Sequence, residues 1–394
     1  SSLCRGEERM SKLLKPGTYF LEGNIACAEA ALLAGCRFYA GYPITPSSEL
    51  MHHMARRMPE IGGVFIQGED EIASIMMALG GSAAGLKSMT ATSGPGLSLM
   101  QESIGLAAML ELPVVIVDIQ RAGPSTGIPT LMGQGDIMQA KWGSHGDYEV
   151  VAYLPSSPQE LFDMTIEAFN TAEAYRVPVI VLADKIIGQM YGKIRVPDYS
   201  EIRLVERKKP GISPDKYMDY LPYDSSELIP PFAAAGEGYR IHMTGLMHDD
   251  RGYPNLSQEA SWKLVTRLVR KIRENAKKIA KWEEHWIDDS EYVVIAYGSV
   301  SGPVKYAIRK ARSEGYKVGL FRPLTAWPFP GWRIEELDNS NIIKKFIVIE
   351  VNMGQIYHIV RAYVRNAEVI HIPGAPGYLP EPQRILSYIE NLCR

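Results

Sequence analysis

The chain has 394 residues, of which 46% are hydrophobic and 22% charged, and its formal net charge is −3. Because one hydrophobic core rarely serves a chain of this length, we expect two domains or one large domain with a smaller one attached. The charge balance lacks the clustered basic excess that a nucleic acid or an anionic membrane would attract. No apolar run reaches the roughly 18 residues of a membrane span, so the sequence predicts a cytoplasmic globular protein.

The stretch from residue 21 to residue 196 alternates short apolar runs with longer amphipathic or small-residue segments. The preceding residues 1–20 are interpreted as a tail or tag, with Met10 a candidate natural start and residues 1–9 a candidate cloning remnant. Strands are expected at residues 37–40, 64–67, 88–92, 114–120 and 177–184, and helices at residues 26–34, 47–58, 71–85, 97–110 and 158–175. Strands that alternate with such helices predict a mostly parallel, doubly wound α/β sheet.

A second α/β region follows an irregular stretch. Residues 197–289 accumulate Pro, Gly, Asp and Tyr and are interpreted as a linker, which ends in one long polar helix expected over residues 257–285. From residue 290 to residue 394 we expect strands at 293–297, 317–320 and 346–350, and helices at 304–314, 355–365 and 381–393. This pattern predicts a compact second α/β domain of ordinary size.

The four cysteines include no C-x-x-C pair, and none lies at metal-ligand spacing from a histidine; they are Cys4, Cys27, Cys36 and Cys393. That pattern argues against a structural zinc and against an iron–sulfur cluster held by this chain alone. We therefore expect reduced thiols and no metal site.

In open parallel sheets ligands bind beyond the carboxyl ends of the strands, and the first such loop runs from Gly41 to Ser48. Thr45 followed by Pro46 is typical of a helix start, with the threonine as N-cap and the proline at the first helical position. Alternatively, the Thr45 hydroxyl and the helix amides face an anionic substrate, because a helix N-terminus stabilises negative charge.

The second loop carries the acidic run Glu69-Asp70-Glu71 in front of an apolar, small-residue helix. Acidic side chains in a first helical turn complement the helix dipole, which is a structural explanation. The functional alternative is that the apolar helix desolvates the Glu71 carboxyl and raises its pKa, as proton exchange near neutral pH requires.

Two further loops follow the next strands. Gly94-Pro95-Gly96 precedes a helix, and its glycines permit a close backbone approach to a ligand, although Gly-Pro-Gly is also a common turn. Arg121, followed by a flexible loop rich in Gly and Ser, suits bidentate capture of a carboxylate. A surface arginine or one paired with Asp118 is the alternative.

Four such loops at successive strand ends predict one cleft that binds an anion beside an acidic group. Other site types fit less well. Gly80, Gly81 and Gly85 fall inside an expected helix, so they form no dinucleotide fingerprint, and neither a phosphate loop nor a nucleophile elbow is present. His242 and His248 lie in an irregular loop, where solvated or structural roles are favoured over a metal site.

The four motifs, in this order, resemble the pyrimidine-binding domain of the 2-oxoacid:ferredoxin oxidoreductases, in particular the α subunit of the 2-oxoglutarate or general 2-oxoacid type. The later runs Ala296-Tyr297-Gly298-Ser299 and Glu350-Val351-Asn352-Met353-Gly354-Gln355 are similar to that family's transketolase C-terminal-like domain. The resemblance covers nearly everything after residue 20. It implies a thiamine-diphosphate-binding-type fold followed by this second domain.

The resemblance also implies roles for individual residues. Glu71, or as the weaker alternative Glu69, matches the glutamate that exchanges a proton with the aminopyrimidine ring of thiamine diphosphate. Thr45 and Arg121 match the residues that hold the 2-oxoacid until carbon dioxide leaves. Residues Gly94, Pro95 and Gly96 match the lining of the cofactor site.

What the chain lacks implies partners. The Gly-Asp-Gly metal motif of thiamine enzymes is not reproduced by Gly133-Gln134-Gly135-Asp136. The resemblance therefore implies a β subunit that brings Mg²⁺, the diphosphate site and an iron–sulfur cluster, with γ and δ ferredoxin-like subunits as further candidates and α–α contacts in a dimer of heteromers. The implied reaction is oxidative decarboxylation of a 2-oxoacid with coenzyme A, with ferredoxin as electron acceptor, and the chain alone should be inactive.

Two alternatives remain at this point. One is a subunit of a non-oxidative thiamine-dependent decarboxylase or a transketolase-like enzyme. The other is a non-catalytic paralogue that only scaffolds, against which the joint presence of Thr45, Glu71 and Arg121 argues. The sequence does not identify the oxoacid.

Overall fold

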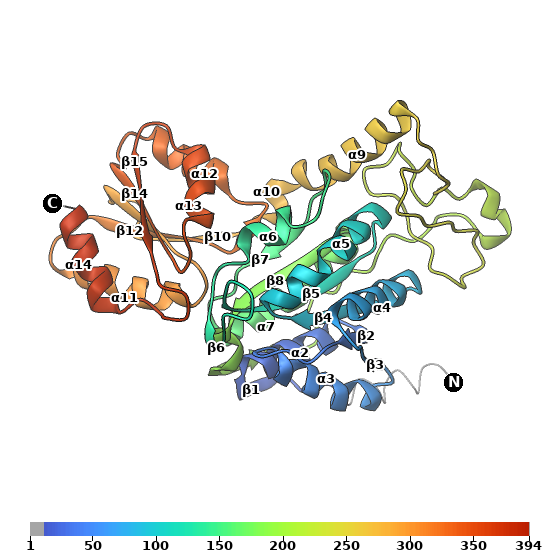
Figure 1. The fold of residues 1–394 in the computed structure, drawn as a ribbon, viewed down its shortest axis with the longest axis horizontal. Coiled ribbons are helices and arrows are strands. Elements are labelled where there is room, and N and C mark those ends of the chain that lie inside the picture. Colours follow the sequence, from blue (N-terminus) through green and yellow to red (C-terminus); the bar gives the residue numbers. More distant parts are fainter. Residues whose placement is uncertain (1–11, 394) are drawn as a thin grey trace.

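In the computed structural model, which describes residues 12–393, two α/β units lie side by side, and an irregular segment projects beyond the larger unit (Figure 1). The interpretation of residues 1–9 and of Met10 lies outside the described residues. Part of the expected tail is structured, because residues 17–20 belong to strand β1 (Gly17–Glu22), which pairs antiparallel with β9 (Tyr191–Val196). None of the helices in the described range combines the length and apolarity needed to cross a bilayer.

The larger unit is built on a sheet with the strand order β13-β7-β8-β5-β4-β2-β3, and β6 pairs with β5. The strands in chain order are β2 (Cys36–Gly41), β3 (Val64–Gln67), β4 (Lys87–Thr92), β5 (Val114–Ala122), β6 (Ile128–Met132), β7 (Val151–Tyr153), β8 (Pro178–Asp184) and β13 (Thr325–Trp327). Neighbouring strands from β7 to β3 are parallel. The predicted doubly wound sheet is therefore confirmed, whereas β6, β7 and β13 were not foreseen.

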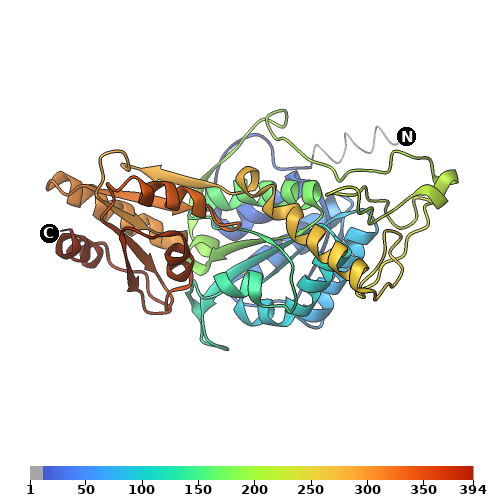
Figure 2. The same ribbon diagram turned by 90° about the horizontal axis from the view of Figure 1, so that it is seen from above.

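Helices cover both faces of this sheet (Figures 1 and 2). One face carries α2 (Gly23–Leu33), α3 (Ser48–Glu60) and α7 (Pro158–Tyr175), with α8 (Lys185–Gln189) following β8; the other carries α4 (Glu71–Ala83), α5 (Gly94–Leu110) and α6 (Ile137–Trp142). Side chains of β5 alternate between the two faces, since Val114 and Ile116 belong to one hydrophobic cluster and Val115 and Val117 to the other. Burial on both faces explains why β5 reads as a continuous apolar run.

The smaller unit is a five-stranded sheet with the order β10-β12-β11-β14-β15, in which only β10 runs antiparallel to its neighbour. Its strands are β10 (Trp282–His285), β11 (Tyr292–Ile295), β12 (Val318–Pro323), β14 (Lys345–Glu350) and β15 (Glu368–Pro373). Its helices are η2 (Gly298–Val300), α11 (Ser301–Ser313), α12 (Gly331–Asn339), α13 (Gln355–Tyr363) and α14 (Pro382–Leu392). The domain boundaries that we expected at residues 196 and 289 stay predictions. Strand β13 follows residue 289 in the chain but pairs with β7 of the larger sheet, so the chain does not divide cleanly there.

The long helix expected over residues 257–285 is wrong in its second half. Helix α9 (Gln258–Arg273) starts after Ser257, whose hydroxyl accepts a hydrogen bond from the Ala260 N–H, and the short α10 (Ala276–Ile279) follows it. The remaining residues form β10, which pairs with β12. Lysine and glutamate there favour a helix locally, and pairing with a distant strand overrides that preference.

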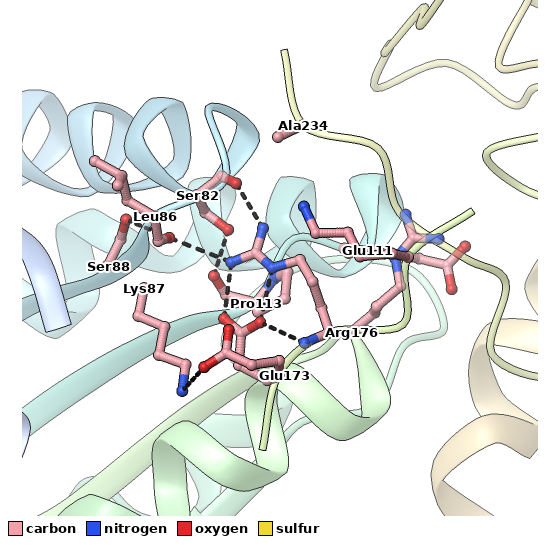
Figure 3. A network of polar contacts seen from close by, with 12 residues as sticks. Ser82, Leu86, Lys87, Ser88, Glu111, Pro113, Glu173, Arg176 and Ala234 are labelled. Carbon is pink, nitrogen blue, oxygen red and sulfur yellow. Dashed lines mark hydrogen bonds and ion pairs between the residues drawn. The ribbon is translucent and has the colours of Figure 1, made fainter. Parts of the chain in front are cut away.

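A buried network of polar contacts fastens residues 197–257, the part of the linker before α9, to the larger unit (Figure 3). This part contains the short helix η1 (Pro214–Asp219). Arg207 is 4% exposed, pairs with Glu173 at 2.7 Å and donates to the carbonyl of Ser82. Arg176, equally buried, donates to the carbonyl of Pro222. Because breaking a buried ion pair is far more costly than losing an exposed one, the pair of Arg207 with Glu173 fixes the linker to helix α7 of the larger unit.

A second group of buried charges joins α9 to the end of α5. Glu111 is fully buried, and it bonds Arg267 and the Lys271 ammonium at 2.8 Å. Burial lowers the pKa of Lys271 to about 8, although Glu111 counteracts it. The cluster thus depends on a single carboxylate that faces several cations.

Candidate active site

Thr45 lies at the carboxyl end of β2, but it does not cap the following helix. Helix α3 begins at Ser48 with Ser47 as N-cap, and the Ser47 N–H bonds the carbonyl of Ile44, which closes a turn before the helix starts. The expected roles of Thr45 as N-cap and Pro46 as first helical residue are therefore wrong. Thr45 is instead exposed at this end of the sheet.

Glu71 is the first residue of α4, directly after the N-cap Asp70, whose carboxylate accepts a 2.7 Å hydrogen bond from the Ala73 N–H. The Glu71 side chain is buried, whereas Glu69 is exposed. Burial raises the pKa of Glu71, the charge of Asp70 adds to the rise, and Arg121 opposes it. Of the two candidate glutamates, Glu71 has the environment that a proton-exchanging carboxyl needs.

Gly94, Pro95 and Gly96 form the first turn of α5 rather than a loop before it, because Ser93 is the N-cap. A Cβ atom built on Gly96 would lie 2.8 Å from the Glu71 Oε1 atom, closer than real Cβ contacts occur. Glycine at this position is therefore what allows the Glu71 carboxyl to lie against the helix start.

Arg121 is the penultimate residue of β5 and pairs with Met132 of β6, so it lies at the carboxyl end of the strand as expected. Its Nη1 atom donates a 3.0 Å hydrogen bond to the carbonyl of Thr45. Burial lowers the pKa of Arg121, and the charges of Asp136 and Glu71 counteract this effect. The guanidinium is thus a cation held between acidic groups on a rigid strand.

A cavity of about 440 Å³ lies where the two units meet. From the larger unit it is lined by Gly94, Pro95, Arg121 and Asp136 among others, and from the smaller unit by Asn352, Met353 and Gln355. Thr45, Glu71 and Gly96 are not among the lining residues; they contact or influence Arg121 and the α5 start from beside it. Two of the four expected loops therefore line this cavity and the other two lie beside it, and the smaller unit adds a wall that we did not predict.

The wall from the smaller unit is held rigidly by Asn352. Its side-chain oxygen accepts hydrogen bonds from the N–H groups of Gly354 and Gln355, and its amide donates to the Gln134 carbonyl at 2.8 Å. Gln134 in turn donates to the Tyr297 carbonyl. The run from Glu350 to Gln355 was noted in the sequence only as a family likeness, and its position after a strand was the signal that could have placed it at the site.

Asp118 and Asp136 form a second feature that sequence reasoning missed. The two carboxyl groups lie against each other, whereas Asp118 forms no ion pair with Arg121 among the described residues, contrary to one alternative. Asp118 is fully buried, and Asp136 lines the cavity with one oxygen next to Gly94. They are 18 positions apart across the β5–β6 hairpin, a spacing that matches no recognisable motif.

The two histidines considered for a metal lie elsewhere, in the linker. His242 Nδ1 contacts the Gly252 carbonyl, and His248 Nδ1 contacts the Leu246 carbonyl. Among residues 12–393 no three His, Cys, Asp or Glu side chains gather as metal ligands would. Cys27 and Cys36 are buried free thiols and Cys393 is partly buried, while Cys4 lies outside the described residues.

Family models match both units. Residues 29–267 match the thiamine diphosphate-binding domain of pyruvate flavodoxin/ferredoxin oxidoreductase, and residues 290–385 match the pyruvate:ferredoxin oxidoreductase core domain II. The chain is 52% identical to the 2-oxoglutarate synthase subunit KorA of Methanocaldococcus jannaschii, over 93% of this chain and 97% of that relative. It is 38% identical to the ketoisovalerate oxidoreductase subunit VorB of Methanothermobacter thermautotrophicus, over 95% of this chain and 98% of that relative.

Solved structures give the same result. The 2-oxoglutarate:ferredoxin oxidoreductase of Magnetococcus marinus, a structure with 2-oxoglutarate, coenzyme A and succinyl-CoA bound, matches with a TM-score of 0.89 and 34% identity. The match covers 96% of this chain but only 65% of that one. A split-gene transketolase matches with a TM-score of 0.53 at 12% identity, which concerns the fold alone.

Proposed function

This chain belongs to the 2-oxoacid:ferredoxin oxidoreductase family, as its motifs predicted, and we propose that it is the α subunit of an enzyme that acts on 2-oxoglutarate. The reaction is oxidative decarboxylation with coenzyme A to succinyl-CoA, carbon dioxide and reduced ferredoxin. The observation that carries this proposal is the meeting of Arg121, Glu71 and Gly96 at one end of the sheet. The oxoacid follows from the higher identity to the 2-oxoglutarate synthase subunit than to the ketoisovalerate subunit.

The residues present fit the aminopyrimidine end of thiamine diphosphate. Gly96 has no side chain, which leaves room beside the buried Glu71 carboxyl, whose pKa is raised. When protonated, this carboxyl can donate a hydrogen bond to a neutral ring nitrogen. When bound, thiamine diphosphate supplies the carbon nucleophile and the electron sink that decarboxylation requires. Glu71 and the first turn of α5, from Gly94 to Gly96, are the residues that would hold it.

Glu71 acts as the proton-exchanging group. Burial raises the pKa of Glu71, which brings its protonation equilibrium closer to neutral pH than that of a carboxyl in water. Such a group can donate a proton at one moment and accept it back at the next without a large free-energy cost. General acid–base assistance of this kind is worth about a hundredfold or more in rate.

Arg121 and Thr45 hold the substrate. The guanidinium uses one N–H on the Thr45 carbonyl and keeps others for the carboxylate of the oxoacid. Because Arg121 is part of β5, its position is set by the sheet and not by a mobile loop. The exposed Thr45 places its hydroxyl at the same strand end, where it can bond the substrate carbonyl.

A β subunit brings Mg²⁺, the diphosphate site and an iron–sulfur cluster. The support is chemical: in the described range no cluster of metal-ligating side chains is present, and the relatives are themselves named as subunits. The apolar side chain of Met353, which lines the cavity, is also 83% exposed. An exposed apolar side chain at a cavity is compatible with a surface that a partner covers. The γ and δ subunits, the α–α contact and the cytoplasmic location stay predictions.

Neither alternative gains support. The likeness to a transketolase is one of fold, so it does not favour a non-oxidative reaction. A purely scaffolding paralogue would have no use for a buried glutamate held against a glycine beside an arginine.

The test is co-expression of this chain with a candidate β subunit, followed by reduction of a viologen dye with pyruvate, 2-oxoglutarate, branched-chain and aryl oxoacids. We expect activity that depends on coenzyme A and is highest with 2-oxoglutarate, and none from this chain alone. If a cofactor-loaded complex failed to reduce the dye with every one of these oxoacids, the enzyme proposal would be contradicted. A preference for another oxoacid would overturn only the substrate assignment.

A further inference from the structure

The Asp118 and Asp136 carboxyl groups face each other behind the oxoacid site. Asp118 lies on β5 three positions before Arg121, and Asp136 is the N-cap of α6. Their contact is side chain to side chain. Among the residues that the structure describes, no third side chain or backbone group donates a hydrogen bond to either oxygen of Asp118 or to Oδ2 of Asp136.

Two carboxylates in contact, one of them fully buried, cannot both be ionised without a large cost, because their repulsion and the lost hydration of Asp118 add together. Burial raises the pKa of Asp118 well above its ordinary value, and burial also raises the pKa of Asp136 although Arg121 counteracts it. If the two carboxyl groups share one proton, the pair carries a single negative charge. Two carboxyls that share a proton titrate as a unit.

That charge lies next to the Arg121 guanidinium. The charged groups that influence the pair are each other and Arg121, and Glu71 at the start of α4 acts on Arg121. One N–H of Arg121 is taken by the Thr45 carbonyl, and its Nε atom is buried without a partner. A carboxylate that binds to Arg121 therefore binds a guanidinium that already has a negative charge next to it.

We propose that Asp118 and Asp136 form a proton-sharing pair whose single charge limits how tightly Arg121 holds the oxoacid carboxylate. This inference rests on the proposed function, in which that carboxylate leaves as uncharged carbon dioxide. An arginine without a counter-charge would stabilise the bound carboxylate more than the transition state in which its charge disappears, and such binding slows the chemical step. Asp118 and Asp136 are positioning residues, because they act through Arg121.

Two isosteric variants of the α–β complex separate this role from a structural one. Asp136→Asn removes the charge, so we expect the KM for the oxoacid and kcat both to fall, each by about tenfold, the effect of one unit charge near a partly buried group. Asp118→Asn replaces the shared proton with an amide N–H and leaves Asp136 ionised, so the pair keeps its single negative charge and the KM should stay close to that of wild type. A structural role would raise the KM in both variants, and that result would overturn the proposal. The KM for coenzyme A should not change in either.

The shared proton is tested separately in the isolated chain by infrared spectroscopy at pH 7. We expect a carboxylic-acid C=O band that shifts on isotopic labelling of aspartate, is lost in Asp118→Asn and persists at a shifted frequency in Asp136→Asn. Absence of that band from the wild-type chain would overturn the proposal even if the complex were active. If the wild-type complex had no oxoacid activity but the band were present, the proposed function would fail and the shared proton would stand.

Discussion

The carbonyl oxygen of Thr45 accepts a 3.0 Å hydrogen bond from Nη1 of Arg121, 76 positions further along the chain. This bond joins the ends of β2 and β5, which are separated in the sheet by β4. Two residues expected to bind the same substrate are thus fixed relative to each other by the protein itself. Positioning of this kind matters because small displacements of substrate-holding groups are costly in rate.

Glu71→Gln should lower kcat of the complex by about a hundredfold or more, because an amide cannot exchange the proton. The same change should stabilise the isolated chain. Burial raises the pKa of Glu71 above its ordinary value of 4.5, so ionising Glu71 costs more free energy in the folded chain than in the unfolded chain. This destabilisation is absent below pH 4.5 and grows as the pH rises from 4.5 through the raised pKa. The thermal midpoint of the variant should therefore exceed that of wild type at pH 7 and match it at low pH.

Glu69→Gln is the matched control for that experiment, since it removes a neighbouring but exposed carboxylate. We expect it to leave kcat and the thermal midpoint almost unchanged. If Glu69→Gln were inactive and Glu71→Gln active, the proton-exchanging role would belong to Glu69.

Gly96→Ala should destabilise the chain and impair the site, because the added methyl would collide with Glu71 and with the Thr92 hydroxyl. Overpacking of this kind costs about 1–3 kcal/mol, measured as the free energy of unfolding in urea. Gly80→Ala is the control: it lies inside α4, has nothing within 4 Å of the added atom, and should stabilise the helix by about 0.5–1 kcal/mol. Equal effects of the two changes would contradict the close packing of Gly96 on Glu71.

Individual residues of the candidate site could be singled out where the local sequence pattern carries a signal. Glu71 was identifiable because an acidic run precedes an apolar helix, and Arg121 because it follows a continuous apolar strand. The helix start at Thr45 was wrong because the turn that precedes α3 depends on a contact between Ser47 and Ile44 that helix-capping rules do not include.

The rest depended on contacts between distant segments. Strand β10 forms only by pairing with β12, so its local helical preference was misleading. The Asn352 loop reaches the site because Gln134, over 200 positions earlier, bonds it. Asp118 and Asp136 meet because the β5–β6 hairpin and the following turn return the chain to β5, and neither residue shows a motif on its own.

Glu111→Gln should cost about 3–5 kcal/mol of the free energy of unfolding, because it leaves buried cations without their carboxylate. Burial alone would raise the pKa of Glu111, but the charges of Lys271 and Arg267 hold this pKa well below its usual range. The stabilisation is therefore fully present above the ordinary glutamate pKa and is lost as the pH falls below it. The difference in urea midpoint between wild type and variant should shrink on acidification.

Glu102→Gln is the control for Glu111, because the exposed Glu102 lies on the same helix α5. A surface carboxylate of this kind should change stability by no more than about 0.5 kcal/mol. A comparable loss in both variants would show that the buried cluster contributes nothing specific.

Arg121→Lys should raise the KM for the oxoacid by about tenfold or more, since a lysine retains the charge but not the planar pair of N–H donors that a carboxylate matches. The shorter reach should also break the bond to the Thr45 carbonyl. The KM for coenzyme A, measured on the same preparation by dye reduction, serves as the internal control and should stay constant. If both KM values rose together, the variant would have disturbed the whole cavity, and if neither rose, the carboxylate would be held by another group. Direct binding of the oxoacid to the loaded complex, measured by calorimetry without coenzyme A, should show the same loss and separate it from any change in the later steps.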